Sequence, residues 1–248
     1  MKISIQQSQD RDAIGLFNAL SHRHHQTHWW NSEKEDIRDF KPEVIFFTET
    51  SKLGIKNIAA VRDAVNVFLK CEVPETCKAE RKFAFESFPI LADTVLFPIT
   101  HFHKEYAVDV FYLSNFPLEK ESEMQTINMI DPLSNGFTWR TAGNVPMPHV
   151  SYIGHVTTPE DASKLCRSAS ICIDFGFKQA INLMKLGCRV ITDMENTWGL
   201  PVFTPSTINK VIMDTLAQPR PVINKYEDKI MSYSQFCGQL SQLIGVTL

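Results

Sequence analysis

The segment ICIDFGFKQAINLMKLGCRVITD, residues 171–193, constrains the fold more than any other part of this 248-residue sequence. It begins and ends with short apolar runs that favour strands, and the residues between them follow a helical pattern. Gly176 lies in the turn before the helix, and Gly187 follows it at the position where glycine commonly ends a helix. The order strand, helix, strand predicts a βαβ unit built on a parallel sheet.

The N-terminal half repeats this format. MKISI predicts a first strand, DRDAIGLFNALSH a helix, NSEKEDIRDF a short acidic helix and EVIFFTE a buried strand. Further along, AVNVFLKCEVP, TVLFP and YAVDVFYLSNFP predict strands, and ETCKAERKFAFESFPILAD has a helical pattern. Polar or proline-marked loops follow these strands, as in α/β sheets whose carboxyl edges form a site.

A second α/β unit is predicted after a junction near residue 116. Residues 119–148 are rich in acids, Asn, Gly and Pro, and the regular pattern returns after them. The expected elements are the strands HVSYIG, SICIDF and CRVITD and the helices TPEDASKLCRSA, FKQAINLMKLG, STINKVIMDTLAQ and KYEDKIMSYSQFCGQLSQLI. We therefore predict an α/β fold with domains at residues 1–115 and 116–248.

Composition excludes several classes of protein. The hydrophobic fraction of 44% and the charged fraction of 21% are typical of a globular protein, and no apolar run reaches the roughly 20 residues that span a bilayer. The N-terminus lacks an apolar signal region, and the six cysteines are scattered without a CxxC pair. We expect a cytoplasmic protein with reduced thiols and no membrane partner.

The stretch from His149 to about Gln218 resembles the C-terminal domain of glycosyltransferases of the GT-B type. The resemblance rests on VSYIGHV, a helix with an acidic first turn, SICIDF, a helix that ends at Gly187, and RVIT. MKISI and KPEVIFF are similar, more loosely, to the opening of that family's acceptor domain. The resemblance implies two Rossmann-like domains that face each other across a cleft, with a nucleotide-sugar donor on the C-terminal one.

The turn DFGFKQ is the predicted diphosphate site. Backbone N–H groups at the start of a helix favour an anion, Gly176 permits close approach and Lys178 adds a positive charge. Arg140 is a second candidate for the donor phosphates, because the leaving group gains negative charge as the glycosidic bond breaks. The alternative for Lys178 is a solvated position on the helix surface.

Four more residues are predicted to bind the donor: Gly143, Gly154, Gln179 and Asn182. Asn182 stands where the family usually has a glutamate that binds the donor ribose, and an amide makes a weaker bond there than a carboxylate. The alternative for Gln179 and Asn182 is the exposed face of their helix. Gly143, in TWRTAGN, also fits an ordinary turn without a ligand.

Candidates for the general base follow predicted strands. An inverting transfer needs a group that takes the proton of the acceptor hydroxyl, and Glu49, Asp10 and His101 are the predicted catalytic residues. Trp29 and Trp30 are the predicted acceptor contacts, with a lid over the core as the alternative. We predict no metal site, since the spacing of the histidines in SHRHHQTHWW does not match a helical pair with a third ligand.

The predicted function is transfer of a sugar from a nucleotide sugar, a UDP-sugar by preference, to a hydroxyl acceptor without a further cofactor. The tentative acceptor is a hydroxymethylated base in double-stranded DNA, as in phage DNA modification, which would place the protein in the host cytoplasm. Residues 162–192 carry five basic residues against one acid, although the net charge is -3.

Two alternatives remain open from the sequence. One is a non-catalytic Rossmann-like nucleotide-binding or regulatory module, which Asn182 favours, and the other is a hydrolase or phosphorylase that cleaves a nucleoside-like bond. The absence of GxGxxG and P-loop motifs disfavours dehydrogenases and ordinary kinases.

Overall fold

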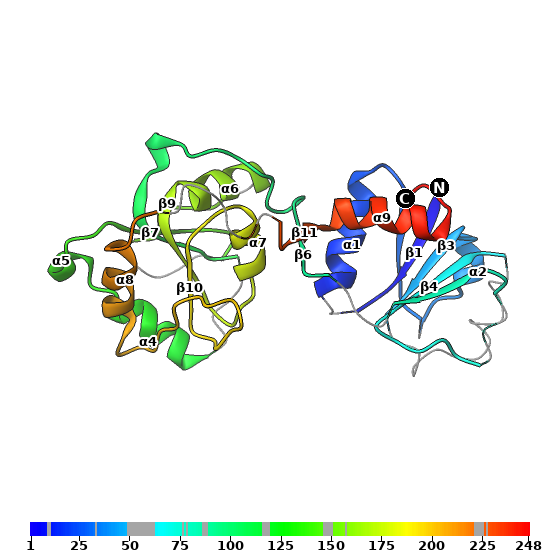
Figure 1. Ribbon diagram of the computed structural model, residues 1–248, viewed down its shortest axis with the longest axis horizontal. Coiled ribbons are helices and arrows are strands. Elements are labelled where there is room, and N and C mark those ends of the chain that lie inside the picture. The colour runs from blue at the N-terminus through cyan, green and yellow to red at the C-terminus, as the bar shows by residue number, and fades with distance from the viewer. Residues whose placement is uncertain are drawn as a thin grey trace. The chain divides into compact units, whose positions relative to one another are not determined.

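The chain divides into two compact units in a computed structural model (Figure 1). The first unit contains Met1–Val95 and Met231–Leu248, and the second contains Leu96–Ile230. The structure describes residues 1–8, 11–32, 34–48, 63–75, 77, 79–85, 89–115, 120–145, 151–156, 158–220, 226 and 228–248. Among these residues, no helix combines the length and the apolar character needed to cross a membrane.

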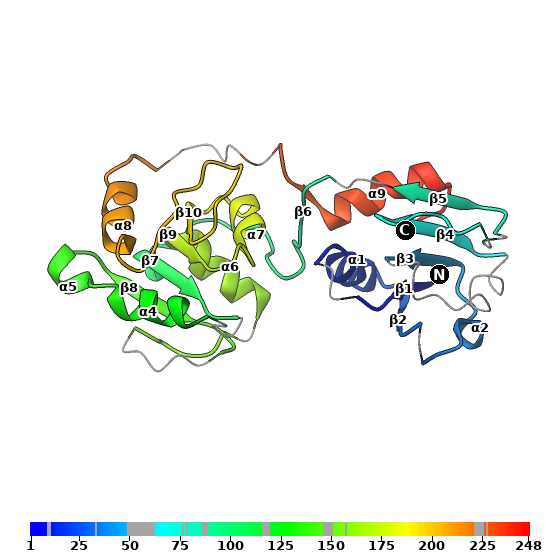
Figure 2. The ribbon, with the colours of Figure 1, turned by 90° about the horizontal axis from the view of Figure 1, so that it is seen from below.

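The first unit is built on a five-stranded parallel sheet in the order β2-β1-β3-β4-β5 (Figures 1 and 2). Its strands are β1 (Lys2–Gln6), β2 (Gln26–Trp30), β3 (Val44–Phe47), β4 (Val65–Leu69) and β5 (Lys82–Phe85). All residues of β3 and β4 are buried, as expected for central parallel strands. Helices α1 (Arg11–His22) and α2 (Ile37–Phe40) complete the first half of this unit.

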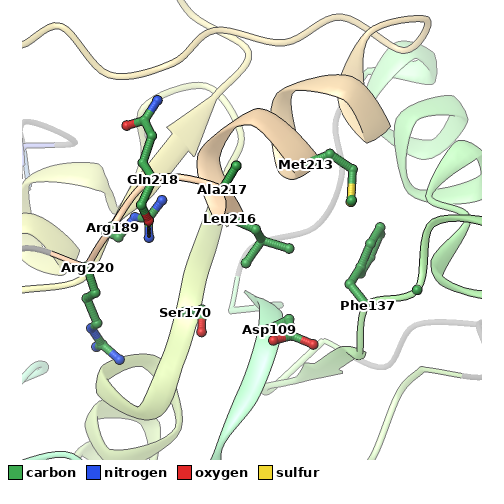
Figure 3. Close-up of a pocket in the computed structure, with 10 residues that line it drawn as sticks. Asp109, Phe137, Ser170, Arg189, Met213, Leu216, Ala217, Gln218 and Arg220 are labelled. Atoms are coloured by element: carbon green, nitrogen blue, oxygen red, sulfur yellow. Dashed lines mark hydrogen bonds between the residues drawn. The ribbon is translucent and has the colours of Figure 1, made fainter.

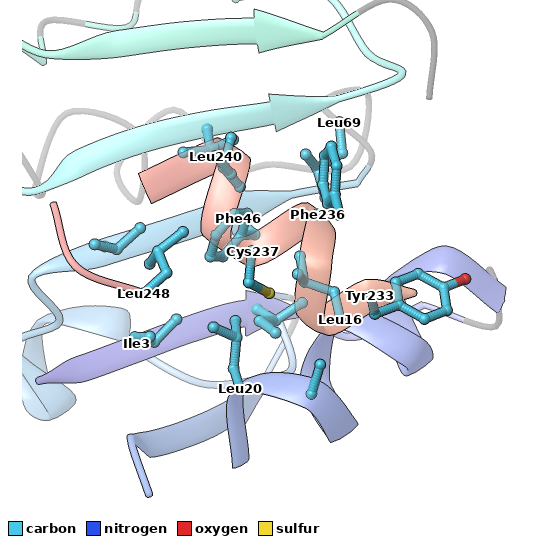
Figure 4. Packing of buried hydrophobic residues seen from close by; sticks show 14 of the residues in the cluster. Ile3, Leu16, Leu20, Phe46, Leu69, Tyr233, Phe236, Cys237, Leu240 and Leu248 are labelled. Atoms are coloured by element: carbon cyan, nitrogen blue, oxygen red, sulfur yellow. The ribbon is translucent and has the colours of Figure 1, made fainter. Parts of the chain in front are cut away.

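The end of the chain packs on the first unit. The short strand β11 (Met231–Ser232) pairs with β6 (Leu91–Ala92), and α9 (Tyr233–Ile244) lies beside α1 over the sheet (Figures 1 and 4). Apolar residues of α9 contact the β1 and β3 side chains in one buried cluster (Figure 4). A Cβ atom at Gly15 would lie 2.1 Å from the Tyr233 ring, so glycine permits the close contact of these two helices.

The second unit is built on a four-stranded parallel sheet in the order β10-β9-β7-β8. Its strands are β7 (Val108–Leu113), β8 (Trp139–Ala142), β9 (Ala169–Asp174) and β10 (Val190–Thr192). The helical segments are η1 (Lys104–Tyr106), α4 (Glu121–Met129), α5 (Pro132–Asn135), α6 (Pro159–Ser168), α7 (Ala180–Lys185) and α8 (Ile208–Leu216). Helices α4 and α8 contribute to the same buried apolar cluster as β7 and β9.

The order of these strands creates a switch point between β7 and β9. The chain leaves β7 to form β8 on one side, then returns to form β9 and β10 on the other side. In open parallel sheets the loops diverge at such a point, and ligands bind at the carboxyl ends of the two strands. The fold therefore marks the ends of β7 and β9, Leu113 and Asp174, as the place to look for a site.

The predicted α/β class with parallel sheets is confirmed, but the two units differ in extent from the predicted 1–115 and 116–248. β7 belongs to the second unit because it hydrogen-bonds to β8 and β9, and α9 belongs to the first unit because its apolar face packs on β1. Phe116, at the predicted junction, lies outside the described residues.

Three local predictions were wrong. Residues Gln26–Trp30, for which no strand was predicted, form β2, because they pair with β1 along its length. Lys82–Phe85 were expected in a helix but form the edge strand β5, whose alternating exposure follows the strand period. Thr94–Phe97 were expected in a strand but lie in a turn that begins where the Asp93 carboxylate accepts a hydrogen bond from the Val95 N–H.

Candidate functional site

A pocket of about 360 Å³ lies at the switch point of the second unit. Amide side chains contribute much of its wall: Asn115 follows β7, Asn144 follows β8, and Gln179 and Asn182 come from the start of α7. The remaining wall is formed by Leu96, Phe97, Val156, Thr158, Pro159, Ala162 and Lys178. Parallel strands place their carboxyl ends at one edge, which is why residues far apart in sequence meet here. We call it the carboxyl-end pocket.

Gln179 and Asn182 are buried in the wall of this pocket. Gln179 is 4% exposed and Asn182 is 9% exposed, so the alternative of an exposed helix face is wrong for both. The Gln179 Nε2 donates a 3.0 Å hydrogen bond to the carbonyl oxygen of Leu113, which ties α7 to the end of β7. The Gln179 Oε1 is buried and has no hydrogen-bond partner among the residues that the structure describes. A buried acceptor of this kind is suited to a ligand hydroxyl or N–H group.

The backbone N–H groups of the turn after β9 are already bonded within the protein. Gly176 donates to Asp193 Oδ1 at 2.7 Å, and Gln179 and Ala180 each donate to a carboxylate oxygen of Asp174 at 3.0 Å. Helix α7 is also only six residues long. These three N–H groups therefore have carboxylate acceptors within the protein, and a diphosphate would have to displace Asp193 or Asp174 to bind them.

Asp174 is the most perturbed acid of this region. Its side chain is 1% exposed, and burial raises its pKa from 3.8 to about 7. The N–H groups of Gln179 and Ala180 act against this change because they stabilise the carboxylate, and the nearby charge of Asp193 acts with it. Asp174 therefore holds the start of α7 through two hydrogen bonds, although its buried carboxylate loses its hydration. It titrates near neutral pH.

Lys178 and Gly176 lie in the turn between β9 and α7. Lys178 is half-buried and lines the carboxyl-end pocket, where its charge lowers the pKa of Asp174. Gly176 has φ +66°, in the left-handed region that glycine adopts most readily.

Gly143 serves a contact within the protein. Its φ is +153°, and a Cβ atom there would lie 2.6 Å from the Ser114 carbonyl carbon. The Gly143 N–H donates to the Gly154 carbonyl oxygen at 3.2 Å, and a Cβ atom at Gly154 would meet no atom within 4 Å. Neither glycine lines the pocket, and the exposed Arg140 side chain on β8 does not line it either. The predicted role of these three residues in donor binding has no support in the geometry.

The other predicted residues do not come together in one described site. Trp30 is fully buried, and its Nε1 donates to the Glu35 carbonyl oxygen, so it belongs to the core as the alternative held. Trp29 packs edge-on against Phe17. His101 is exposed in the loop before η1. Asp10 and Glu49 lie outside the described residues.

No group of three metal-ligating side chains occurs in the part of the chain that the structure describes. The sequence analysis missed Asn115, Asn144, Thr158 and Asp174. A usable signal was present for two of them, since Asn115 and Asp174 lie near the ends of predicted strands.

Comparison with known proteins identifies the fold of this chain. No family model matches the sequence, and no curated protein matches it at a significant level. Solved structures with a similar fold include the spinosyn forosaminyltransferase SpnP, at a TM-score of 0.52 and 9% identity over 99% of both chains. The glycosyltransferase SnogD from Streptomyces nogalater has a TM-score of 0.51 and 8% identity, over 98% of this chain and 99% of that one.

A third similar structure is the UDP-GlcNAc 2-epimerase from Methanocaldococcus jannaschii. Its TM-score is 0.51 and its sequence identity is 11%, and the alignment covers 98% of this chain and 100% of that chain. The mixed α/β fold with parallel sheets is therefore that of GT-B glycosyltransferases over nearly the whole chain. At these identities the likeness extends to the fold alone.

Proposed function

We propose that this protein is a glycosyltransferase and that its second unit binds a nucleotide sugar in the carboxyl-end pocket. The observation that carries the proposal is the amide-lined pocket at the switch point of a GT-B-like sheet. Amide groups both donate and accept hydrogen bonds, which suits the hydroxyls of a ribose and a sugar. A volume near 360 Å³ lies within the usual range of small-molecule sites.

Specific roles follow from the wall of the pocket. Gln179 would accept a hydrogen bond from a donor hydroxyl or from the N–H of a uracil ring through its unpartnered Oε1. Lys178 would neutralise the diphosphate as the bond between the sugar and the diphosphate breaks. Since the neighbouring N–H groups bond to Asp174 and Asp193, this single lysine would contribute a large share of phosphate binding.

The chemistry itself moves one glycosyl group. The bond from the anomeric carbon to the diphosphate oxygen breaks, a bond to the acceptor oxygen forms, and the acceptor proton passes to a base. Glu49, Asp10 and His101 remain the predicted bases, and a UDP-sugar remains the predicted donor with no further cofactor.

The acceptor that we propose is a hydroxymethylated base in DNA, as the sequence analysis suggested. Retention of a duplex with hydroxymethylcytosine, weakened by added salt, would support it, because phosphate contacts release counterions on binding. Equal binding at low and high salt, or no binding, would contradict it.

A second candidate is epimerisation of a nucleotide sugar. It is favoured by the epimerase from M. jannaschii, whose fold is as similar to this chain as those of the glycosyltransferases. A third candidate is the non-catalytic nucleotide-binding module, which is favoured by Asn182 in the pocket wall, where the family usually has a glutamate.

One experiment separates these candidates. The melting temperature is measured with UDP, GDP, ADP and their sugars, because a ligand that binds only the folded protein raises it. The ligands that bind are then incubated with the protein and the products are analysed. Free nucleoside diphosphate indicates transfer or hydrolysis, an isomeric nucleotide sugar indicates epimerisation, and binding without turnover indicates the module. No rise in melting temperature with any nucleotide would contradict all three.

A further inference from the structure

The amino end of the same sheet carries a second and larger pocket, of about 510 Å³ (Figure 3). Asp109 and Ser170 enter it from the first residues of β7 and β9, and Arg189 directly precedes β10. The end of α8 and Arg220 form much of the remaining wall. It lies at the opposite strand ends from the carboxyl-end pocket, so it is separate from the proposed donor site. We call it the amino-end pocket.

Two arginines in this pocket have no acidic partner among the described residues. Arg189 Nη1 donates to the Gln218 carbonyl oxygen at 3.0 Å, and Arg220 Nη2 donates to the Arg167 carbonyl oxygen at 2.7 Å. Arg167 itself donates to the Gly187 carbonyl oxygen at 3.1 Å. Three guanidinium groups are thus held by neutral carbonyl oxygens, and Arg220 also lies over the Phe102 ring, 5.7 Å from its centroid. No carboxylate of the described residues forms an ion pair with Arg189 or Arg220.

The electrostatic consequence is visible in both arginines. Burial lowers the pKa of Arg189, and the charge of Arg220 lowers it further. Burial also lowers the pKa of Arg220, followed by the charge of Arg167. In addition, the buried Arg189 Nη2 has no hydrogen-bond acceptor in the described part of the chain. An anion between Arg189 and Arg220 would supply both the missing counter-charge and additional acceptors.

The rest of the amino-end pocket limits which anion would fit. Figure 3 shows Asp109 and Ser170 between the arginines and the apolar side chains of Phe137 and Met213. Asp109 Oδ2 accepts hydrogen bonds from the Thr138 N–H and Oγ1, both at 2.8 Å, which hold its carboxylate in place. A second anionic group near Asp109 would be repelled, whereas a hydroxyl group could donate to it.

We propose that the amino-end pocket binds a small organic phosphate with a hydroxyl-bearing body, such as a sugar phosphate. The phosphate lies between the guanidinium groups of Arg189 and Arg220, which match its oxygens in a two-bond geometry. The hydroxyl groups reach Asp109 and Ser170, and one face of the body packs on Phe137 or Leu216. The site is independent of the proposed donor site.

Calorimetric titration of the whole protein tests this proposal with three probes: glucose 6-phosphate, inorganic phosphate and glucose. We expect glucose 6-phosphate to bind most tightly, inorganic phosphate more weakly and glucose not measurably. Arg220→Gln should weaken glucose 6-phosphate binding by about tenfold or more, because one of two charge-assisted contacts is lost. Arg38→Gln is the matched control, since Arg38 pairs with Asp36 on the surface of the first unit.

Arg189→Lys provides a second test that keeps the charge and removes the planar fork. It should weaken binding severalfold without loss of folding. No binding of glucose 6-phosphate at millimolar concentration, or binding that Arg220→Gln and Arg189→Lys leave unchanged, would overturn the proposal. Equal affinities for glucose 6-phosphate and inorganic phosphate would overturn the part that concerns Asp109 and Ser170. Arg220→Gln should leave UDP binding unaltered, which separates this result from that of the donor site.

Discussion

The carboxyl-end pocket and the amino-end pocket lie at opposite ends of one parallel sheet, and they handle charge in opposite ways. At the carboxyl end, Asp174 and Asp193 accept the backbone N–H groups of the turn after β9. At the amino end, Arg189 and Arg220 donate to neutral carbonyl oxygens and have no described acidic partner. The first pocket has its strongest donors satisfied within the protein, and the second keeps positive charge available for a ligand.

This difference shows that the position of a pocket and its chemistry have separate causes. The switch point places the carboxyl-end pocket where a nucleotide site is expected. However, Asp174 accepts hydrogen bonds from the backbone N–H groups at the start of α7, so the donor that we propose would be bound mainly by amide side chains and by the charge of Lys178. Three substitutions test this comparison, and they follow in order of expected effect.

Gly143→Ala should have the largest effect. The new Cβ atom would lie 2.6 Å from the Ser114 carbonyl carbon, and the backbone would keep a φ that favours glycine. We expect a loss of about 4 kcal/mol in the free energy of unfolding, from overlap and backbone strain together. Urea denaturation gives the value directly.

Gly154→Ala is the control for this substitution. Gly154 also has a positive φ, of +132°, but a Cβ atom there would meet no atom within 4 Å. We expect only the strain component, about 1–3 kcal/mol. Equal losses for the two variants would show that the close approach of Gly143 to the Ser114 backbone adds nothing to the loss of stability.

Asp174→Asn should change the dependence of stability on pH. The folded protein binds the Asp174 proton with a pKa of about 7, above the ordinary 3.8, so the unfolded chain releases that proton at lower pH. Stability from this group is therefore full below about pH 4 and decreases as the pH rises toward 7. Between pH 5 and 8 the wild type should lose roughly 3 kcal/mol relative to Asp174→Asn.

Thermal or urea unfolding of both proteins across this pH range measures the difference. Histidines and other groups titrate in both proteins, so their contributions cancel in the comparison. A constant difference between wild type and variant from pH 5 to 8 would show that Asp174 is ionised throughout. In that case the hydrogen bonds from the Gln179 and Ala180 N–H groups would lower the pKa of Asp174 by more than burial raises it.

Lys178→Met should have the smallest effect. It removes the ammonium group that lines the carboxyl-end pocket, and we expect UDP to bind about tenfold more weakly, which corresponds to about 1.4 kcal/mol. Lys210→Met, at an exposed position of α8 away from that pocket, is the matched control. Calorimetry with UDP provides the affinities. A Lys178→Met protein that binds UDP as tightly as the Lys210→Met protein would remove Lys178 from the donor site.

A segment was predicted correctly when its own residues favour the structure that it forms, and it was missed when that structure depends on hydrogen bonds to a distant strand. β9 and α7 were predicted correctly because an apolar run, a glycine turn and a helical period coincide in residues 171–187. β2 was missed because QTHWW is polar at its start and becomes a strand only through pairing with β1. β5 was missed because its pattern over four residues suits a helix as well as a strand until β4 lies beside it.

The site was predicted in part for the same reason. Gln179, Asn182 and Lys178 were chosen from one local segment, and the structure places all three at one pocket. Asn115 and Asn144 were missed because their loops meet α7 only after the sheet has formed. The bonds from Gly176 to Asp193 and from Gln179 to Asp174 could not be foreseen, since no spacing rule fixes which carboxylate accepts a loop N–H.

The sequence by itself determined the α/β class, the parallel sheet of the second half and the helix that carries Gln179 and Asn182. These follow from apolar periodicity and glycine positions, which act over short stretches of chain. Only the tertiary structure decided which unit α9 and β7 belong to. It also decided that the Asp174 carboxylate accepts hydrogen bonds from the start of α7, and that Arg189 and Arg220 line one pocket. Those outcomes depend on contacts between distant segments, and local patterns do not specify such contacts.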